Sequence, residues 1–141
     1  MRIMAIDYGD AHTGIAVSDP TGFLAGFTTV IDAYRPDIVA DQIALLAREH
    51  GAERLVLGHP INMDGTRGPR SEKAQAMRQL LEETTGLPVV LWDERRTTID
   101  AHQILFNSGK NAKKRKKVVD AVAASLILEG YLTYLKNHPE G

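Results

Sequence analysis

The first part of the chain alternates short apolar runs with turn residues, a pattern that predicts strands. Residues 2–7 form an apolar run typical of a buried strand, and residues 13–18 and 26–31 are short and rich in β-forming side chains. Turn residues follow the first run at Gly9 and the second run at 19–22. Connections this short allow antiparallel neighbours only, so we expect a meander of three antiparallel strands.

Helical and strand patterns then alternate. Pro36 suits the first turn of a helix that ends at Gly51, and residues 54–58 predict a fourth strand. The apolar positions of the helix approximate one face, made by Ile38, Val39, Ile43, Leu45 and Leu46.

A polar loop over residues 59–69 leads to a second helix, which Ser71 would cap and Gly86 would close. The remaining patterns predict a fifth strand over 88–92, a helix from Thr97 or Thr98, and a last helix from about Lys116 to Leu135. This order indicates the α/β class, with one domain over residues 1–141. We expect a mixed five-stranded sheet, in which three antiparallel strands are followed by parallel additions, flanked by helices.

Composition narrows the class of protein. The hydrophobic fraction is 43% and the charged fraction 25%, as in ordinary globular domains. The chain has no cysteine, which excludes disulfides, thiolate zinc sites and a thiol nucleophile. No apolar stretch reaches the length of a membrane span, so we expect a cytoplasmic protein without a membrane partner.

Charge is distributed unevenly. The formal net charge is −1, yet six cations lie between Lys110 and Lys117. A local basic patch on an otherwise acidic chain indicates a polyanion held at one place. A solvated basic segment is the plainer alternative.

Acidic residues follow or interrupt apolar elements at three distant places. Asp7 ends the first strand, Asp93 and Glu94 follow the fifth, and Asp120 lies in an apolar stretch of the last helix. Each has an ordinary explanation, as a turn former, a strand-end cap or the ion-pair partner of Arg115 or Lys116. A buried, ionised and unpaired Asp120 would cost several kcal/mol, so it requires a cation.

A divalent metal ion bound by acids from all three places would supply the cation that Asp120 requires. The five histidines have no zinc-like spacing, and a set of carboxylates favours Mg²⁺ or Mn²⁺. Such a site, with one or two ions, is suited to hydrolysis of a phosphodiester. Strand alternation puts Trp92 and Glu94 on one face and Asp93 on the other, so the sequence leaves open which acid points toward Asp7.

Four motifs in order give the chain a family resemblance. They are Asp7-x-Gly9-x4-Gly14-Ile-Ala-Val-Ser-Asp19, Val56-Leu-Gly-His-Pro60 with Met63-Asp-Gly-Thr-x-Gly-Pro69, Trp92-Asp-Glu-Arg-Arg-Thr-Thr98, and Lys116-Lys-Val-Val-Asp120. With them the chain resembles the YqgF family, bacterial proteins of the ribonuclease H-like superfamily related to Holliday-junction resolvases. The resemblance implies a ribonuclease H-like fold, a divalent-metal nuclease site at Asp7, Glu94 and Asp120, and maturation of the 16S ribosomal RNA precursor. Many relatives carry a basic residue in the first hairpin, where this chain has Asp10-Ala11-His12.

Cations and polar groups near these acids are candidates for binding nucleic acid. They are Asn62, Arg67, Arg70, Arg95, Lys113, Lys114, Arg115, Lys116 and Lys117. Backbone N–H groups near Arg70 and Ser71 would add a phosphate contact at a helix start. Aromatic residues are few, at 6%, so we expect recognition of nucleic-acid shape rather than base stacking.

Several functions fit these residues. The first is a nuclease acting on structured RNA, namely the 16S precursor, with the pre-ribosome as a further partner. The second is a nuclease acting on branched DNA, which would need a homodimer, and the sequence leaves monomer and homodimer open. The others are a ribosome-assembly factor that binds without cleaving, and a nucleotide-binding protein of the actin and sugar-kinase type, suggested by Asp7-x-Gly9 with Gly14.

Overall fold

The computed structural model describes residues 1–19, 25–60, 68–93 and 112–138, with the backbone alone for 25 and 112–120. The helix expected from Thr97 or Thr98 lies outside these residues. Five strands form one sheet in the order β3-β2-β1-β4-β5. Their bounds are Ile3–Asp7 (β1), His12–Ser18 (β2), Ala25–Asp32 (β3), Arg54–His59 (β4) and Val89–Asp93 (β5).

Connection length explains the direction of each strand. β2 pairs antiparallel with β1 and β3, while β4 pairs parallel with β1 and β5. Short turns allow only the antiparallel pairs, and the parallel ones are reached through the helices α1 (Pro36–His50) and α2 (Pro69–Thr85). The predicted mixed sheet is confirmed.

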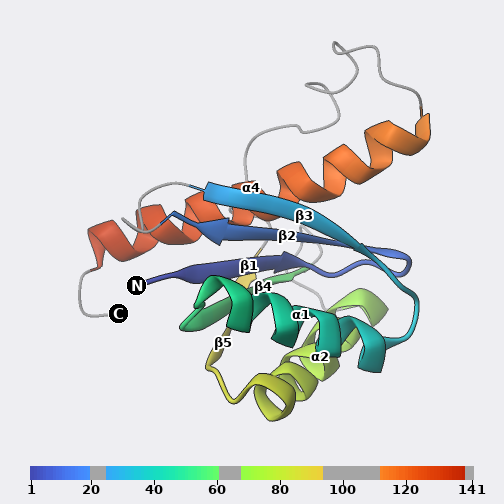
Figure 1. The fold of residues 1–141 in the computed structure, drawn as a ribbon, viewed down its shortest axis with the longest axis horizontal. Coiled ribbons are helices and arrows are strands. Elements are labelled where there is room, and N and C mark those ends of the chain that lie inside the picture. Colours follow the sequence, from blue (N-terminus) through green and yellow to red (C-terminus); the bar gives the residue numbers. More distant parts are fainter. Residues whose placement is uncertain (20–24, 61–67, 94–111, 139–141) are drawn as a thin grey trace.

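Helices cover both faces of the sheet (Figure 1). α1 and α2 lie on one face, and α4 (Ala112–Asn137) crosses the other. Strand alternation gives each face its own apolar cluster: Met4 and Ile6 pack toward α1 and α2, whereas Ile3 and Ala5 pack toward α4. β1 is therefore buried on both faces, and residues at its end have fixed directions.

The bounds of α1 agree with the sequence, but its buried face differs. Pro36 stands in the first turn, and Gly51 closes the helix with a φ of 66°. The buried positions are Val39, Ala40, Ile43 and Ala47. Ile38 and Leu45 are exposed instead, because they lie off this buried stripe of the helix.

α2 begins three residues earlier than a Ser71 cap would allow. Gly68 is the N-cap and Pro69 opens the helix, so the predicted capping role of Ser71 is wrong. Ser71 is fully buried instead. The other end agrees with the sequence, at Thr85 and Gly86.

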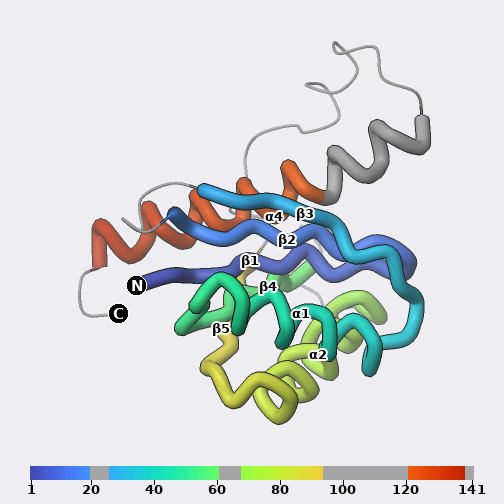
Figure 2. Tube along the Cα trace, viewed as in Figure 1, coloured from blue at the N-terminus to red at the C-terminus, as the bar shows by residue number. Residues whose placement is uncertain are grey.

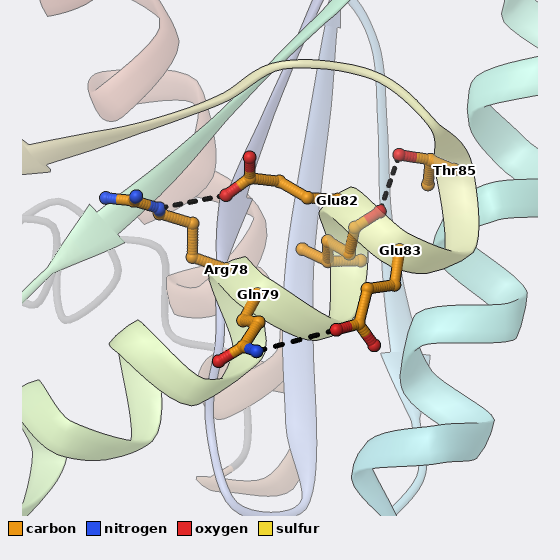
Figure 3. Close-up of polar contacts among 6 residues, drawn as sticks. Arg78, Gln79, Glu82, Glu83 and Thr85 are labelled. Carbon is orange, nitrogen blue, oxygen red and sulfur yellow. Dashed lines mark hydrogen bonds and ion pairs between the residues drawn. The ribbon is translucent and has the colours of Figure 1, made fainter.

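Polar pairs stabilise the last turns of α2 (Figure 3). Arg78 Nε lies 3.0 Å from Glu82 Oε1, and the Thr85 hydroxyl donates to the Leu81 carbonyl at 2.6 Å. Exposed pairs one turn apart contribute a few tenths of a kcal/mol each. They fit a helix whose outer face meets water.

α4 starts at Ala112, about one turn before the predicted start at Lys116. The basic residues 113–117 are therefore helical rather than a segment that leads into the helix. Figure 2 draws the first part of α4, where the backbone alone is described, in grey. Within the described ranges, no helix has the length and apolarity needed to cross a membrane.

Candidate active site

Asp7 is the last residue of β1 and is half-buried. It continues the alternation of Ile3 and Ala5, which pack in the cluster under α4. The Asp7 side chain is therefore on the α4 face, at the carboxyl end of the strand.

The carboxyl ends of β1, β4 and β5 meet at this edge of the sheet. Ile6 pairs in register with Leu57, and His59 pairs with Asp93. Asp93 is thus close to the level of Asp7, two strands away. The edge collects the ends of three parallel strands, where polar side chains are presented by a rigid sheet.

Asp93 nevertheless lies on the opposite face from Asp7. In β5, Val89 and Leu91 pack with the cluster under α1 and α2, while Val90 and Trp92 pack with the cluster under α4. Asp93 follows Val89 and Leu91 in the alternation. The sequence left open which acid points toward Asp7, and the structure puts Asp93 on the other face. Glu94 lies outside the described residues.

α4 approaches the Asp7 end of the sheet with its N-terminal half. β1 and α4 run in opposite directions (Figure 1). At the far end, Arg54 at the start of β4 donates to the hydroxyl of Tyr131 at 2.8 Å. Residue 120 precedes Ala124 by one turn, on the stripe of α4 that packs against the sheet through Ala124, Ile127 and Tyr131. By helical spacing, position 120 therefore lies on the stripe of α4 that faces the side of the sheet carrying Asp7.

Of the three acids predicted to hold a metal ion, Asp7 alone has a described side chain. Among the described side chains, no group of three or more histidines and acids is placed to hold a metal ion. Of Asp120 the backbone is described, and Glu94 lies beyond β5. The donor chemistry of the three acids, all hard oxygens, fits Mg²⁺ or Mn²⁺.

A buried polar network that the sequence did not reveal lies behind this edge. His59, the last residue of β4, has its Nε2 2.6 Å from the Ser71 hydroxyl oxygen. Gln75 Nε2 donates to the same oxygen at 3.2 Å. His59 is 6% exposed and Ser71 is fully buried. The network ties the end of β4 to the first turn of α2. The sequence held one signal for this contact: strand alternation puts His59 on the same face as Leu55 and Leu57, which pack toward α1 and α2.

The predicted nucleic-acid ligands divide into three groups. Arg70 is exposed in the first turn of α2, and Asn62, Arg67 and Arg95 lie outside the described residues. The basic residues 113–117 occupy the first turns of α4. The N–H groups of Ser71 and Glu72 donate to the Gly68 carbonyl, and the phosphate contact expected near Arg70 and Ser71 stays a prediction.

The turn between β1 and β2 is tight and charged. A Cβ at Gly9 would clash with the backbone carbonyl oxygen of His12, so the turn requires glycine. Lys73 from α2 lies 3.1 Å from Asp10 in this hairpin. Burial raises the pKa of the Tyr8 hydroxyl above its ordinary value of 10.0, while Lys73 lowers it and Asp10 raises it further.

A family model described as RuvX, Holliday junction resolvase, matches residues 1–134. The chain belongs to this family. The resemblance to YqgF proteins is thereby confirmed. Curated relatives named "Putative pre-16S rRNA nuclease" include one from Listeria monocytogenes, 45% identical over 94% of this chain and 97% of the relative. Another, from Halothermothrix orenii, is 42% identical over 95% of this chain and 96% of the relative.

A solved structure supports the fold. RuvC of T. thermophilus in complex with a Holliday junction substrate aligns over 95% of this chain and 96% of that chain. The TM-score is 0.63 at 14% identity, a likeness that shows the ribonuclease H-like fold.

Proposed function

We propose that this chain is a divalent-metal-dependent nuclease that hydrolyses phosphodiester bonds at the 5′ end of the 16S ribosomal RNA precursor. The observation that carries the proposal is Asp7, held at the carboxyl end of β1 on the face that α4 covers. Family membership and the names of the relatives support the activity and the substrate. A single domain over residues 1–141, acting in the cytoplasm where ribosomes are assembled, fits this activity and this substrate.

Three acids of the chain would hold the metal. We propose Asp7 on β1, Asp120 on α4 and Glu94 as the three ligands. Asp93 is disfavoured because it lies on the face covered by α1 and α2. Bound Mg²⁺ or Mn²⁺ would polarise the phosphodiester and lower the pKa of a water molecule. The rigid sheet contributes positioning, because Asp7 ends a strand that is buried on both faces.

Basic side chains would hold the phosphates on either side of the scissile bond. Arg70 lies in the first turn of α2, and residues 113–117 lie in the first turns of α4. Asn62, Arg67 and Arg95 complete the proposed set. Contacts of this kind supply affinity that decreases as salt increases, and they position the strand without reading its sequence.

The test is cleavage of a labelled RNA that spans the 5′ precursor junction. The purified chain is incubated with Mg²⁺, with Mn²⁺ or with EDTA, beside an Asp7→Asn variant. We expect cleavage that requires the metal and that falls by roughly a thousandfold in the variant, because a metal ion contributes several kcal/mol to the transition state. RNA binding without cleavage under every condition would refute the nuclease and favour an assembly factor.

The description of the matching family favours one alternative substrate, a four-way DNA junction. Resolution of a junction needs paired cuts, and therefore two active sites in a homodimer. The same assay with a four-way junction separates the two proposals. Cleavage of the junction alone, by a dimer, would replace the RNA substrate and leave the metal site unchanged.

A further inference from the structure

A pocket of about 250 Å³ lies on the other side of the β1 end from the Asp7 carboxylate. Tyr8 lines it from the end of β1, Tyr34 from the residues before α1, and Met77 and Leu80 from α2. Asp10 and Lys73 also line it and form an ion pair of 3.1 Å. Three separate stretches of the chain thus meet around one hollow.

The lining combines apolar surface with two phenol rings. Met77 is 2% exposed, whereas Tyr34 is 79% exposed, so the pocket has a buried floor and an aromatic ring open to solvent. Flat aromatic surface that water covers is suited to stacking with a planar ligand. The hydroxyl of Tyr8 and the two charged groups supply donors and an acceptor for the edge of such a ligand.

The size of the pocket limits the ligand. Sites for drug-sized molecules occupy roughly 300–1,000 Å³. At about 250 Å³ the pocket is smaller than this range, and it fits a single ring system better than a whole nucleoside triphosphate.

Its position relates it to the proposed active site. Tyr8 follows Asp7 in the chain, so their Cα atoms are about 3.8 Å apart, while their side chains point to opposite faces of the sheet. Tyr8 packs with the cluster under α1 and α2, and Asp7 continues the alternation of the α4 face. The pocket is therefore one residue along the chain from Asp7, at the same edge of the sheet.

We propose that this pocket binds one unpaired base of the substrate strand, with the base stacked on Tyr34 and the adjoining phosphate near Lys73. The inference rests on the proposed nuclease function and adds a base-binding subsite to it. Polar groups at the rim favour a base over an apolar side chain of a protein partner. The sequence favoured recognition of nucleic-acid shape over base stacking, and this proposal adds one stacked base to it.

The test uses binding, so that it does not depend on cleavage. In an Asp7→Asn background, the RNA carries 2-aminopurine at successive positions of its single-stranded 5′ flank. We expect fluorescence to be quenched at one position, and the quenching to be lost with Tyr34→Ala but kept with Tyr34→Phe. An abasic site at that position should weaken binding about tenfold, the size expected for one stacked base.

Matched controls come from the same elements. Leu45→Ala removes exposed apolar surface from α1 without touching the pocket. Lys73→Gln should reduce the slope of affinity against salt by about one phosphate contact, whereas Arg78→Gln further along α2 should not. Thermal melting of each variant checks that the fold is intact.

The outcomes separate the pocket from the nuclease. RNA that binds with no quenched position, and with equal affinity for Tyr34→Ala, overturns the pocket even where the chain with Asp7 intact cleaves. Quenching that requires Tyr34 supports the pocket. If the chain with Asp7 intact nevertheless fails to cleave, only the nuclease proposal is refuted. Failure to bind RNA at all overturns both.

Discussion

At the scale of single residues, Tyr8 shows how a position beside the proposed active site affects stability. Its hydroxyl is partly buried, and burial raises its pKa above 10.0. Below pH 10 the folded and unfolded chains both keep the proton. As the pH rises past 10, the unfolded chain loses the proton first, so the folded state loses stability.

Replacing Tyr8 with phenylalanine removes this titration. We predict that the free energy of unfolding of the unaltered chain decreases more steeply above pH 10 than that of Tyr8→Phe. Urea denaturation at pH values on both sides of 10 measures the difference. Parallel curves for the two proteins would mean that Tyr8 is not the group responsible.

The sequence predicted the acids but not the faces on which they lie. Period-two alternation separated Asp93 from Glu94, yet the direction of each face depends on which helices pack there. That information comes from Val89, Leu91 and Trp92, whose apolar contacts lie far away in the sequence. Likewise, Ser71 has the chemistry of a cap, but a buried contact with His59 uses its hydroxyl.

At the scale of elements, glycine and proline fixed the helix ends that the sequence predicted. Gly51 closes α1 in the left-handed region, with a φ of 66° and no atom within 4 Å of an added Cβ. The cost of a side chain there is therefore conformational and not steric. We predict that Gly51→Ala lowers the free energy of unfolding by about 1 kcal/mol.

Asparagine is the matched control for Gly51, because it tolerates this conformation better than alanine. Denaturation of Gly51→Asn should show a smaller loss than Gly51→Ala. Equal losses for both would indicate that a contact, rather than backbone conformation, limits this position.

The start of α4 shows where the same reasoning failed. The sequence predicted a helix start at about Lys116, but lysine, arginine and alanine are good helix formers. The helix accordingly includes residues 113–117. Charge pattern indicated the partner of this segment, and intrinsic propensity decided its structure.

At the scale of the whole molecule, function depends on bringing distant segments to one edge of the sheet. Motif spacing was enough to predict the fold and the proposed acids, since each motif ends or begins an element. The pocket of Tyr8, Tyr34 and Lys73 could not be predicted, because no local pattern relates those three residues. Only the packing of α1 and α2 on the β1 end brings them together.

Asp7, Glu94 and Asp120 are the acids proposed to hold the metal, and Asp93 is the acid proposed not to. The decisive measurement is the single-turnover rate of RNA cleavage in Mg²⁺ for Glu94→Gln, Asp93→Asn and the unaltered chain. We predict a loss of roughly a thousandfold for Glu94→Gln, from lost metal binding, and a change of only a few-fold for Asp93→Asn. A large loss for Asp93→Asn with Glu94→Gln unaffected, or equal rates for all three, would contradict a metal site on the α4 face of β1.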